Sequence, residues 1–444
     1  MYIYNNQYYY CLLVIMDIIN LMKNKIRSLI THPFVKGSFI FTISNFIISL
    51  LNYFFNFLVG RTLGPSSYGE VTAFFSYITI FSIPFTIIST LIIQKISSTN
   101  LDHYAYSKSL EGWFITKIKK WWFLFIMFIF ITPFIPKLTN ISPITGYLII
   151  ASVIIAPFSI FYISALQGLK LFLIVAVINV ITAFIKFLGS FLVSLHIDGL
   201  LTVMSFLMFS TVFNLIAVFF SFNKYVKPEK LDYKIGKRIR DAVFNRYFVL
   251  TTASIISIIL LTNVDIIFSK KYFTATEAGF FAAWSLFAKI IYYLIGPFVT
   301  LTFIFFSSDK DSKDQDRILI GTLGVLTIVS FLCLILYSFF PAVVEMIFGS
   351  KFKYIVNFLP LAAIFGFFYS AINLFNNYFL AKKSLFTLIL PLSFPLYILT
   401  LLLYCRSLEK IMRVDIVFGL LITFIYLCAY FYKKKFNRLY IISS

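Results

Sequence analysis

The sequence predicts an all-α, polytopic membrane protein with about 12 transmembrane helices in two parallel six-helix lobes. The 444 residues are 60% hydrophobic and only 12% charged, with a mean hydropathy of +0.93. Soluble domains are typically about 45–50% apolar and about 25% charged. The apolar residues form continuous blocks of roughly 20 residues, which suits helical spans better than barrel strands. A repeated motif and an uneven distribution of basic residues then divide and orient these helices.

Twelve apolar blocks are expected to cross the membrane. The predicted spans are 38–59, 71–93, 114–135, 144–164, 171–194 and 200–222 in one lobe, and 247–267, 278–306, 318–340, 359–380, 385–403 and 414–431 in the other. The predicted organisation is a cytoplasmic N-terminal segment (1–37), an N-terminal lobe (38–222), a basic cytoplasmic linker (223–246), a C-terminal lobe (247–431) and a basic cytoplasmic tail (432–444).

The basic residues predict the orientation. With both termini in the cytoplasm, 27 of the 38 Lys and Arg residues fall in cytoplasmic segments or at the cytoplasmic start of the third span, and nine fall in outer loops. The positive-inside rule favours this orientation. The net charge of +21 is therefore explained by topology, and nucleic acid is not an expected partner.

A motif at the end of the first span recurs in weaker form about 210 residues later. The first copy is Gly60-Arg61-Thr62-Leu63-Gly64-Pro65-Ser66-Ser67-Tyr68-Gly69, and the second is Lys271-Tyr272-Phe273-Thr274-Ala275-Thr276-Glu277-Ala278-Gly279. In each copy a basic residue is followed, eight positions on, by a glycine that opens the next helix. The repetition indicates two related halves with the same orientation, with a cavity between them.

Polar residues align on one face of the first span. Thr42, Asn45, Ser49, Asn52 and Asn56 recur at steps of three and four, so they stack on one side of a helix. This face is expected to border a water-filled cavity, and Asn45, Asn52 and Asn56 are its candidate substrate-binding residues. The alternative is that these side chains form hydrogen bonds between helices.

Three charged residues are assigned to spans. Lys289 lies about eleven residues into its span, where a charge costs roughly 2.5–3.5 kcal/mol, so it is expected to face a hydrated cavity or a partner such as Asp265. Lys186 lies nearer the outer half of its span. Asp265 is the one carboxylate placed within a span, and it is either an ion-coupling site or an interfacial acid. Together with Arg61 at a helix end, the lysines would suit a phosphate-bearing cargo.

Several kinds of site are not expected. The sequence contains no Gly-x-x-x-x-Gly-Lys-[Ser/Thr] phosphate loop. Its four cysteines are scattered and form no Cys-x-x-Cys pair. We therefore expect no metal site, no cofactor and no enzymatic activity.

Four motifs occur in the order typical of one transporter family. They are Gly60–Gly69, Ala165–Gly168, Asn263–Ile267 with Glu277-Ala278-Gly279, and Phe348–Phe352. On these motifs the sequence resembles polysaccharide transporters of the O-antigen flippase (Wzx-like) type. These belong to the multidrug/oligosaccharidyl-lipid/polysaccharide (MOP) exporter superfamily.

The resemblance implies a V-shaped, MATE-like pair of lobes around a basic central cavity in the bacterial cytoplasmic (inner) membrane. It implies a cargo of polyprenyl-diphosphate-linked oligosaccharide, such as an O-antigen, capsule or exopolysaccharide repeat unit, which moves to the outer leaflet. Arg61, Lys186 and Lys289 would hold the diphosphate, and Asp265 would couple transport to H⁺ or Na⁺. Glycan polymerase machinery and membrane lipid are the other candidate partners.

Three other functions remain open. A multidrug/cation antiporter of the same superfamily would be expected to need more buried acids. A peptidoglycan-precursor flippase would resemble a fourteen-helix plan, whereas twelve spans are predicted. A membrane glycan polymerase or ligase would normally need a sizeable catalytic loop, and the predicted outer loops are short.

Overall fold

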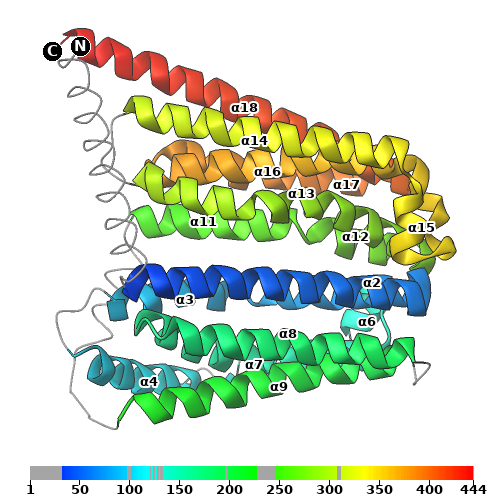
Figure 1. The fold of residues 1–444 in the computed structure, drawn as a ribbon, viewed down its shortest axis with the longest axis horizontal. Helices are drawn as coiled ribbons and strands as arrows, with labels where there is room; N and C mark the ends of the chain where they lie inside the picture. The colour runs from blue at the N-terminus through cyan, green and yellow to red at the C-terminus, as the bar shows by residue number, and fades with distance from the viewer. Residues whose placement is uncertain are drawn as a thin grey trace, which may run out of the picture.

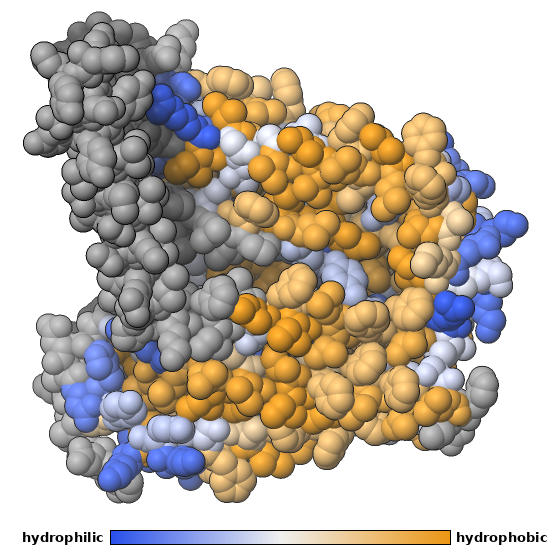
Figure 2. Space-filling model, in the orientation of Figure 1, coloured by the Kyte–Doolittle hydropathy of each residue, from blue (hydrophilic) through white to orange (hydrophobic). Residues whose placement is uncertain are grey.

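The computed structural model describes residues 33–97, 102–120, 134–195, 199–227, 246–307 and 312–443, and isolated positions between 120 and 134. Within these residues the protein is helical, without strands. Ten of the described helices are long and apolar enough to cross a membrane. Hydrophobic side chains cover the middle of the visible face, and hydrophilic ones gather toward its two ends (Figure 2). The predicted fold class is confirmed.

The helices form two groups with α2 at their boundary (Figure 1). The N-terminal lobe contains α2 (Pro33–Phe81), α3 (Ile83–Ser97), α4 (His103–Lys120), α6 (Phe134–Thr139), α7 (Pro143–Gly168), α8 (Phe172–Ser194) and α9 (Leu200–Tyr225). The C-terminal lobe contains α11 (Arg246–Leu261), α12 (Val264–Tyr272), α13 (Ala275–Ser307), α14 (Ser312–Phe339), α15 (Ala342–Phe348), η1 (Ser350–Phe358), α16 (Leu359–Ala381), η2 (Leu385–Leu388), α17 (Ile389–Tyr404) and α18 (Leu408–Ser443).

The first two predicted spans are the two arms of a hairpin within α2. Gly64 has φ +79° and ψ −177°, a non-helical conformation that glycine adopts without steric cost. The Phe55 and Phe75 rings lie 5.9 Å apart, although twenty residues of straight helix would separate them by about 30 Å. The chain therefore reverses at Gly64, and the second arm continues beyond Ser82 as α3.

Most of the other predicted spans coincide with single helices. The seventh is divided into α11 and α12, because the helix breaks at Thr262 and Asn263. The third (114–135) lies partly outside the described residues, and α4 already begins at His103. Much of the N-terminal segment 1–37 and of the linker 223–246 is also outside them.

The predicted tail begins as a continuation of α18. The helix passes the expected end of the last span at 431 and runs to Ser443. Lys434 forms an ion pair with Asp316 of α14 at 2.7 Å, and Tyr430 donates a hydrogen bond to the same carboxylate. The C-terminal helix is therefore attached to its own lobe.

Candidate substrate cavity between the lobes

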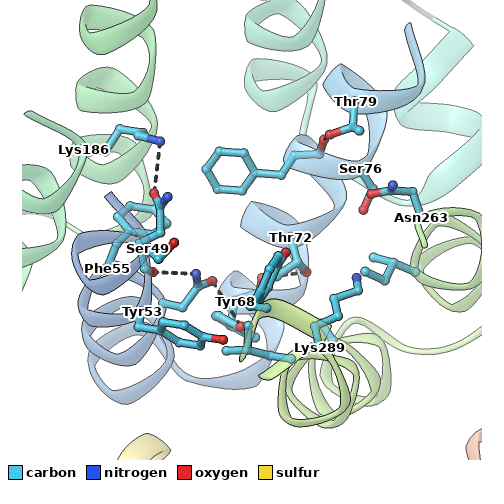
Figure 3. A pocket seen from close by; sticks show the side chains of 17 residues that line it. Ser49, Tyr53, Phe55, Tyr68, Thr72, Ser76, Thr79, Lys186, Asn263 and Lys289 are labelled. Carbon is cyan, nitrogen blue, oxygen red and sulfur yellow. Dashed lines mark hydrogen bonds between the residues drawn. The ribbon is translucent and has the colours of Figure 1, made fainter. Parts of the chain in front are cut away.

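A cavity of about 340 Å³ lies between the two arms of α2, α8 and α13 (Figure 3). Its lining is rich in hydroxyls, amides and aromatic rings and includes two lysines. The lining residues are Ser49, Asn52, Tyr53, Phe55, Asn56, Tyr68, Thr72, Phe75, Ser76, Thr79, Lys186, Asn263, Ile266, Ala282, Leu286, Lys289 and Tyr293. Both lobes contribute, so the cavity is a feature of their interface.

The wall from the N-terminal lobe is a chain of hydrogen bonds. Lys186 Nζ on α8 donates to Asn52 Oδ1 at 3.1 Å. Asn56 Nδ2 donates to the Asn52 carbonyl at 2.7 Å, and the Tyr68 hydroxyl donates to Asn56 Oδ1 at 3.2 Å. These bonds fix both amides and the ammonium at the cavity surface.

The polar face predicted on the first span does line this cavity, at Ser49, Asn52 and Asn56. Asn45 lies further along the same arm, is exposed, and is not among the lining residues. Helical spacing placed Asn45 on the correct face but could not show where the opposite lobe meets that face.

The second arm presents three hydroxyls, those of Thr72, Ser76 and Thr79. The Thr72 and Thr79 hydroxyls donate to carbonyls of their own helix. A hydroxyl that donates its proton in this way still has acceptor lone pairs. These groups can therefore accept hydrogen bonds from hydroxyl or amide donors of a bound molecule.

Lys289 lines the wall from the C-terminal lobe. Its Nζ donates to the Thr262 carbonyl at 2.9 Å, at the break between α11 and α12. Non-helical backbone at membrane depth is tolerated where it borders a cavity or is buried in protein. Figure 3 shows Lys289 and Lys186 on different elements, on opposite sides of the cavity. The structure therefore brings both predicted lysines to one site.

Two buried carboxylates lie close enough to interact with Lys289. Asp265 on α12 and Asp415 on α18 are each 1% exposed, and both interact electrostatically with its ammonium. Asp265 Oδ1 accepts from the Ile266 amide at 2.8 Å, and Asp415 Oδ1 accepts from the Tyr397 hydroxyl at 2.7 Å. Among the described residues, the second oxygen of each carboxylate has no hydrogen-bond partner.

The expectation that Asp265 is the one carboxylate within a span was wrong, because Asp415 is also buried in a helix. It was missed although it is the second residue of the last predicted span, 414–431. A residue at a predicted helix end is easily assigned to the interface. Here α18 begins earlier, at Leu408, so Asp415 lies about two turns inside it.

Arg61 lies away from the cavity. Its guanidinium is positioned over the Phe57 ring, 5.7 Å from the centroid, and donates to the Met346 carbonyl at 3.1 Å. Arg61 is exposed and is not among the lining residues. The structure therefore does not bring it together with Lys186 and Lys289 in this conformation.

The two copies of the repeated motif meet at one end of the molecule, which we call the motif end. A Cβ atom on Gly69 would lie 2.8 Å from the Gly279 nitrogen, and one on Gly279 would lie 1.8 Å from the Pro65 carbonyl oxygen. Asn140 also donates across the lobes to the Lys271 carbonyl at 3.0 Å. The absence of side chains at both glycines lets α2 and α13 pack closely at this end.

The fold is similar to those of several solved membrane transporters. A lipid II flippase, MurJ, in an inward closed conformation matches with a TM-score of 0.67 and 15% identity over 88% of this chain and 87% of that chain. An inward-facing multidrug resistance MATE family transporter of the MOP superfamily gives 0.65, with 12% identity over 89% and 96%. An outward-facing structure with the same description gives 0.57, with 14% identity over 90% and 95%. No family model and no curated protein sequence matches the chain.

Proposed function

We propose that the protein is a flippase that moves a polyprenyl-diphosphate-linked oligosaccharide across the bacterial cytoplasmic membrane by alternating access. The cargo would be an O-antigen, capsule or exopolysaccharide repeat unit. The observation that carries this proposal is the cavity between the lobes, which has a lysine on each side and no carboxylate among its lining residues. The similarity in fold to a lipid II flippase supports a lipid-linked cargo.

The cavity offers the chemistry that a sugar diphosphate needs. Lys186 and Lys289 would hold the phosphate oxygens, because charge-assisted hydrogen bonds are strong in a partly desolvated site. Asn52 and Asn56 would bond to sugar hydroxyls. The Tyr53 and Tyr293 rings, which meet edge to face at 6.2 Å across the lobes, would provide apolar contact. The polyprenyl tail would remain in the lipid.

Lys289 would couple the cargo to an ion gradient. When a phosphate group of the cargo binds the Lys289 ammonium, the positive charge of Lys289 no longer compensates Asp265 and Asp415, with which it interacts. Uncompensated buried carboxylates are costly. Binding of H⁺ or Na⁺ at their unpartnered oxygens would restore neutrality, so cargo and ion occupancy would depend on each other.

The proposed orientation follows from the distribution of basic residues. The motif end would face outward, and both termini and the linker 223–246 would lie in the cytoplasm. In this orientation the close contact between α2 and α13 at Gly69 and Gly279 would hold the lobes together on the outer side. The two lobes, 38–222 and 247–431, would rock about the interface between α2 and α13 to open that side.

Among the alternatives, a peptidoglycan-precursor flippase would carry a cargo of the same diphosphate chemistry and would use the same lysines. A multidrug/cation antiporter is favoured less, because its cationic cargo would meet two lysines in the cavity lining. A glycan polymerase or ligase would need catalytic groups. The described residues contain no group of three or more His, Cys, Asp or Glu that could hold a metal ion.

Reconstitution tests the proposal directly. Liposomes containing the purified protein should transfer a fluorescent polyprenyl-diphosphate oligosaccharide between leaflets, and Lys289→Ala should slow this transfer at least about tenfold. Lys119→Ala removes an exposed lysine of α4 that is not among the lining residues of the cavity and should leave the rate unchanged. Wild-type transfer by Lys289→Ala, or glycan-bond formation by the purified protein, would contradict the proposal.

Cells provide a second test and identify the cargo. A deletion strain should accumulate a lipid-linked oligosaccharide on the cytoplasmic side of its membrane, and the structure of that glycan would distinguish a polysaccharide repeat unit from a peptidoglycan precursor. Extrusion of cationic dyes by cells that contain the protein, without accumulation of a glycolipid in the deletion strain, would favour the antiporter.

A further inference from the structure

The connection between α14 and α16 extends over the motif end and contacts the opposite lobe (Figure 1). It consists of α15 and the short helix η1, and it contains the motif Phe348-Gly349-Ser350-Lys351-Phe352. Phe348 and Phe352 are 1% and 0% exposed, although they belong to a connecting segment. Both rings are therefore buried against other residues, and some of these residues belong to the N-terminal lobe.

Gly60 and Tyr68 of the first repeated motif form this part of the packing surface. A Cβ atom on Gly60 would lie 2.2 Å from Cδ1 of Phe348, so the ring occupies the space that any side chain at position 60 would need. On its other side, the Phe348 ring meets Tyr68 edge to face at 5.3 Å. Phe352 meets the same tyrosine at 6.0 Å. The two phenylalanines are therefore seated on the α2 hairpin.

Polar contacts hold the backbone of the same segment in place. Arg61 donates to the Met346 carbonyl, two residues before Phe348. Gly349 ends α15 with φ +84° and lies against the Arg61 side chain. The Lys351 side chain passes 3.3 Å from the Cβ position of Gly64, at the tip of the hairpin. Two motifs about 290 residues apart thus form one contact between the lobes.

Tyr68 connects this contact to the cavity. Its ring touches both phenylalanines, while its hydroxyl lines the cavity and donates to Asn56 Oδ1 at 3.2 Å. Tyr68 is fully buried, at 0% exposure. A cargo that displaces this hydroxyl from Asn56 therefore also disturbs the surface on which Phe348 rests.

We propose that Phe348 and Phe352, seated on Gly60 and Tyr68, form an interlobe latch that must release before the cavity opens at the motif end. The proposal rests on the alternating-access part of the proposed function. With the latch engaged, the lobes are held together at this end. On release, the Phe348 ring leaves the space beside Gly60 (the Gly60 notch), and Arg61 separates from Met346. Because Tyr68 contacts both the latch and the cavity, binding of a cargo in the cavity would promote release of the latch.

Accessibility of the cavity from the outer side tests the latch without any substrate. The four native cysteines (Cys11, Cys333, Cys405 and Cys428) are replaced by serine, and Thr72→Cys places one thiol in the cavity, one turn from Gly69. An impermeant maleimide is then added to the outer side of oriented proteoliposomes. Lys353→Cys, at an exposed position of η1, serves as the accessible reference.

Two variants should open the latch by different routes. Phe348→Ala removes the ring, and Gly60→Ala places a methyl group where the ring lies. Each should raise the labelling rate at Thr72→Cys about tenfold or more through a shift of the conformational population. The double variant should not exceed Phe348→Ala alone, because the new methyl group then meets no ring.

The matched controls remove a phenylalanine or add a methyl group elsewhere. Phe340 is 63% exposed beside α15, and a Cβ atom on Gly321 would meet no heavy atom within 4 Å. Phe340→Ala and Gly321→Ala should label at the parent rate. Unchanged labelling of both latch variants, eluting as monodisperse protein, would refute the latch, as would an equal increase in the controls.

A reversible cross-link supplies the opposite perturbation. Arg61→Cys and Met346→Cys, joined by a short bis-methanethiosulfonate reagent, should abolish outer labelling at Thr72→Cys, and a reductant should restore it. Cross-linked protein that still labels at the parent rate would overturn the proposal. These labelling experiments need no glycolipid. They can therefore refute the latch proposal without refuting the flippase proposal, and the transport assays can refute the flippase proposal without refuting the latch.

Discussion

Substitution of Lys289 is the most informative single perturbation, because its ammonium lies both at the cavity surface and close to two buried carboxyl groups. It lines the cavity, and it also interacts electrostatically with the buried carboxyl groups of Asp265 and Asp415. Lys289→Ala removes the bond to the Thr262 carbonyl, and a hydrogen bond from a charged donor is worth about 1.5–3 kcal/mol. It also removes the positive charge that interacts with two buried carboxyl groups, and a buried charge left uncompensated costs up to about 3–5 kcal/mol.

Uptake of a proton by one carboxylate offsets part of this cost. We therefore expect Lys289→Ala to lower the free energy of unfolding by about 2–4 kcal/mol. Lys186→Ala is the matched comparison, because Lys186 bonds to the neutral amide of Asn52. Its loss removes one hydrogen bond from a charged donor, worth about 1.5–3 kcal/mol, and leaves no buried carboxylate without its positive charge. Both variants should lose transport, but Lys289→Ala should lose more stability than Lys186→Ala.

Thermal unfolding in detergent, followed by tryptophan fluorescence, measures the stability difference, and transfer of labelled glycolipid in liposomes measures transport. The double variant Lys289→Ala/Asp415→Asn removes the cation together with one carboxylate, so it should recover most of the lost stability and none of the transport. Equal stability of the two lysine variants would refute the assignment of Lys289 as the counter-charge. Recovery of transport in the double variant would refute its role in binding the cargo.

Three further predictions follow from the geometry. Gly279→Ala should force α13 away from Pro65, with an overpacking cost of about 1–3 kcal/mol, and should reduce the rate of glycolipid transfer in liposomes. The control Gly324→Ala adds a Cβ atom that meets no heavy atom within 4 Å, and this variant should transport normally. Asn56→Ala should raise the KM for glycolipid several-fold while Asn45→Ala leaves it unchanged, as measured by titration of the substrate in liposomes. Asp415→Asn should make transport insensitive to an imposed H⁺ or Na⁺ gradient, whereas retained gradient dependence would show that Asp415 takes no part in coupling.

Hydrophobic periodicity was sufficient for the fold class, because a chain in hydrocarbon must satisfy its backbone hydrogen bonds within each helix. The blocks at 144–164, 171–194 and 200–222 correspond to α7, α8 and α9. The break in the seventh span at Thr262 and Asn263 was not predicted. It lies within an apolar block, and the Thr262 carbonyl it frees is bonded by a lysine 27 residues away, a contact that spacing does not reveal.

Sequence spacing also found the polar faces, since residues three and four apart share one side of a helix. Asn52, Asn56 and Lys289, which it assigned to polar faces, line the cavity in the structure, whereas Asn45, which it grouped with them, does not. It could not assign Arg61. The same helix end can present a side chain to the cavity or to the opposite lobe, and only the position of Met346 decides between them.

By itself, the sequence determined a helical membrane protein with repeated halves, a polar face on its first helix and lysines within its spans. These features depend on local composition and on helical period, which a single chain carries without reference to its partners. Only the tertiary structure decided that the repeated glycines of the two halves meet, that Asp415 joins Asp265 beside Lys289, and that Phe348 rests in the notch at Gly60. Each of these depends on the packing of helices distant in sequence, where the absence of one Cβ atom or the approach of one charge sets the contact.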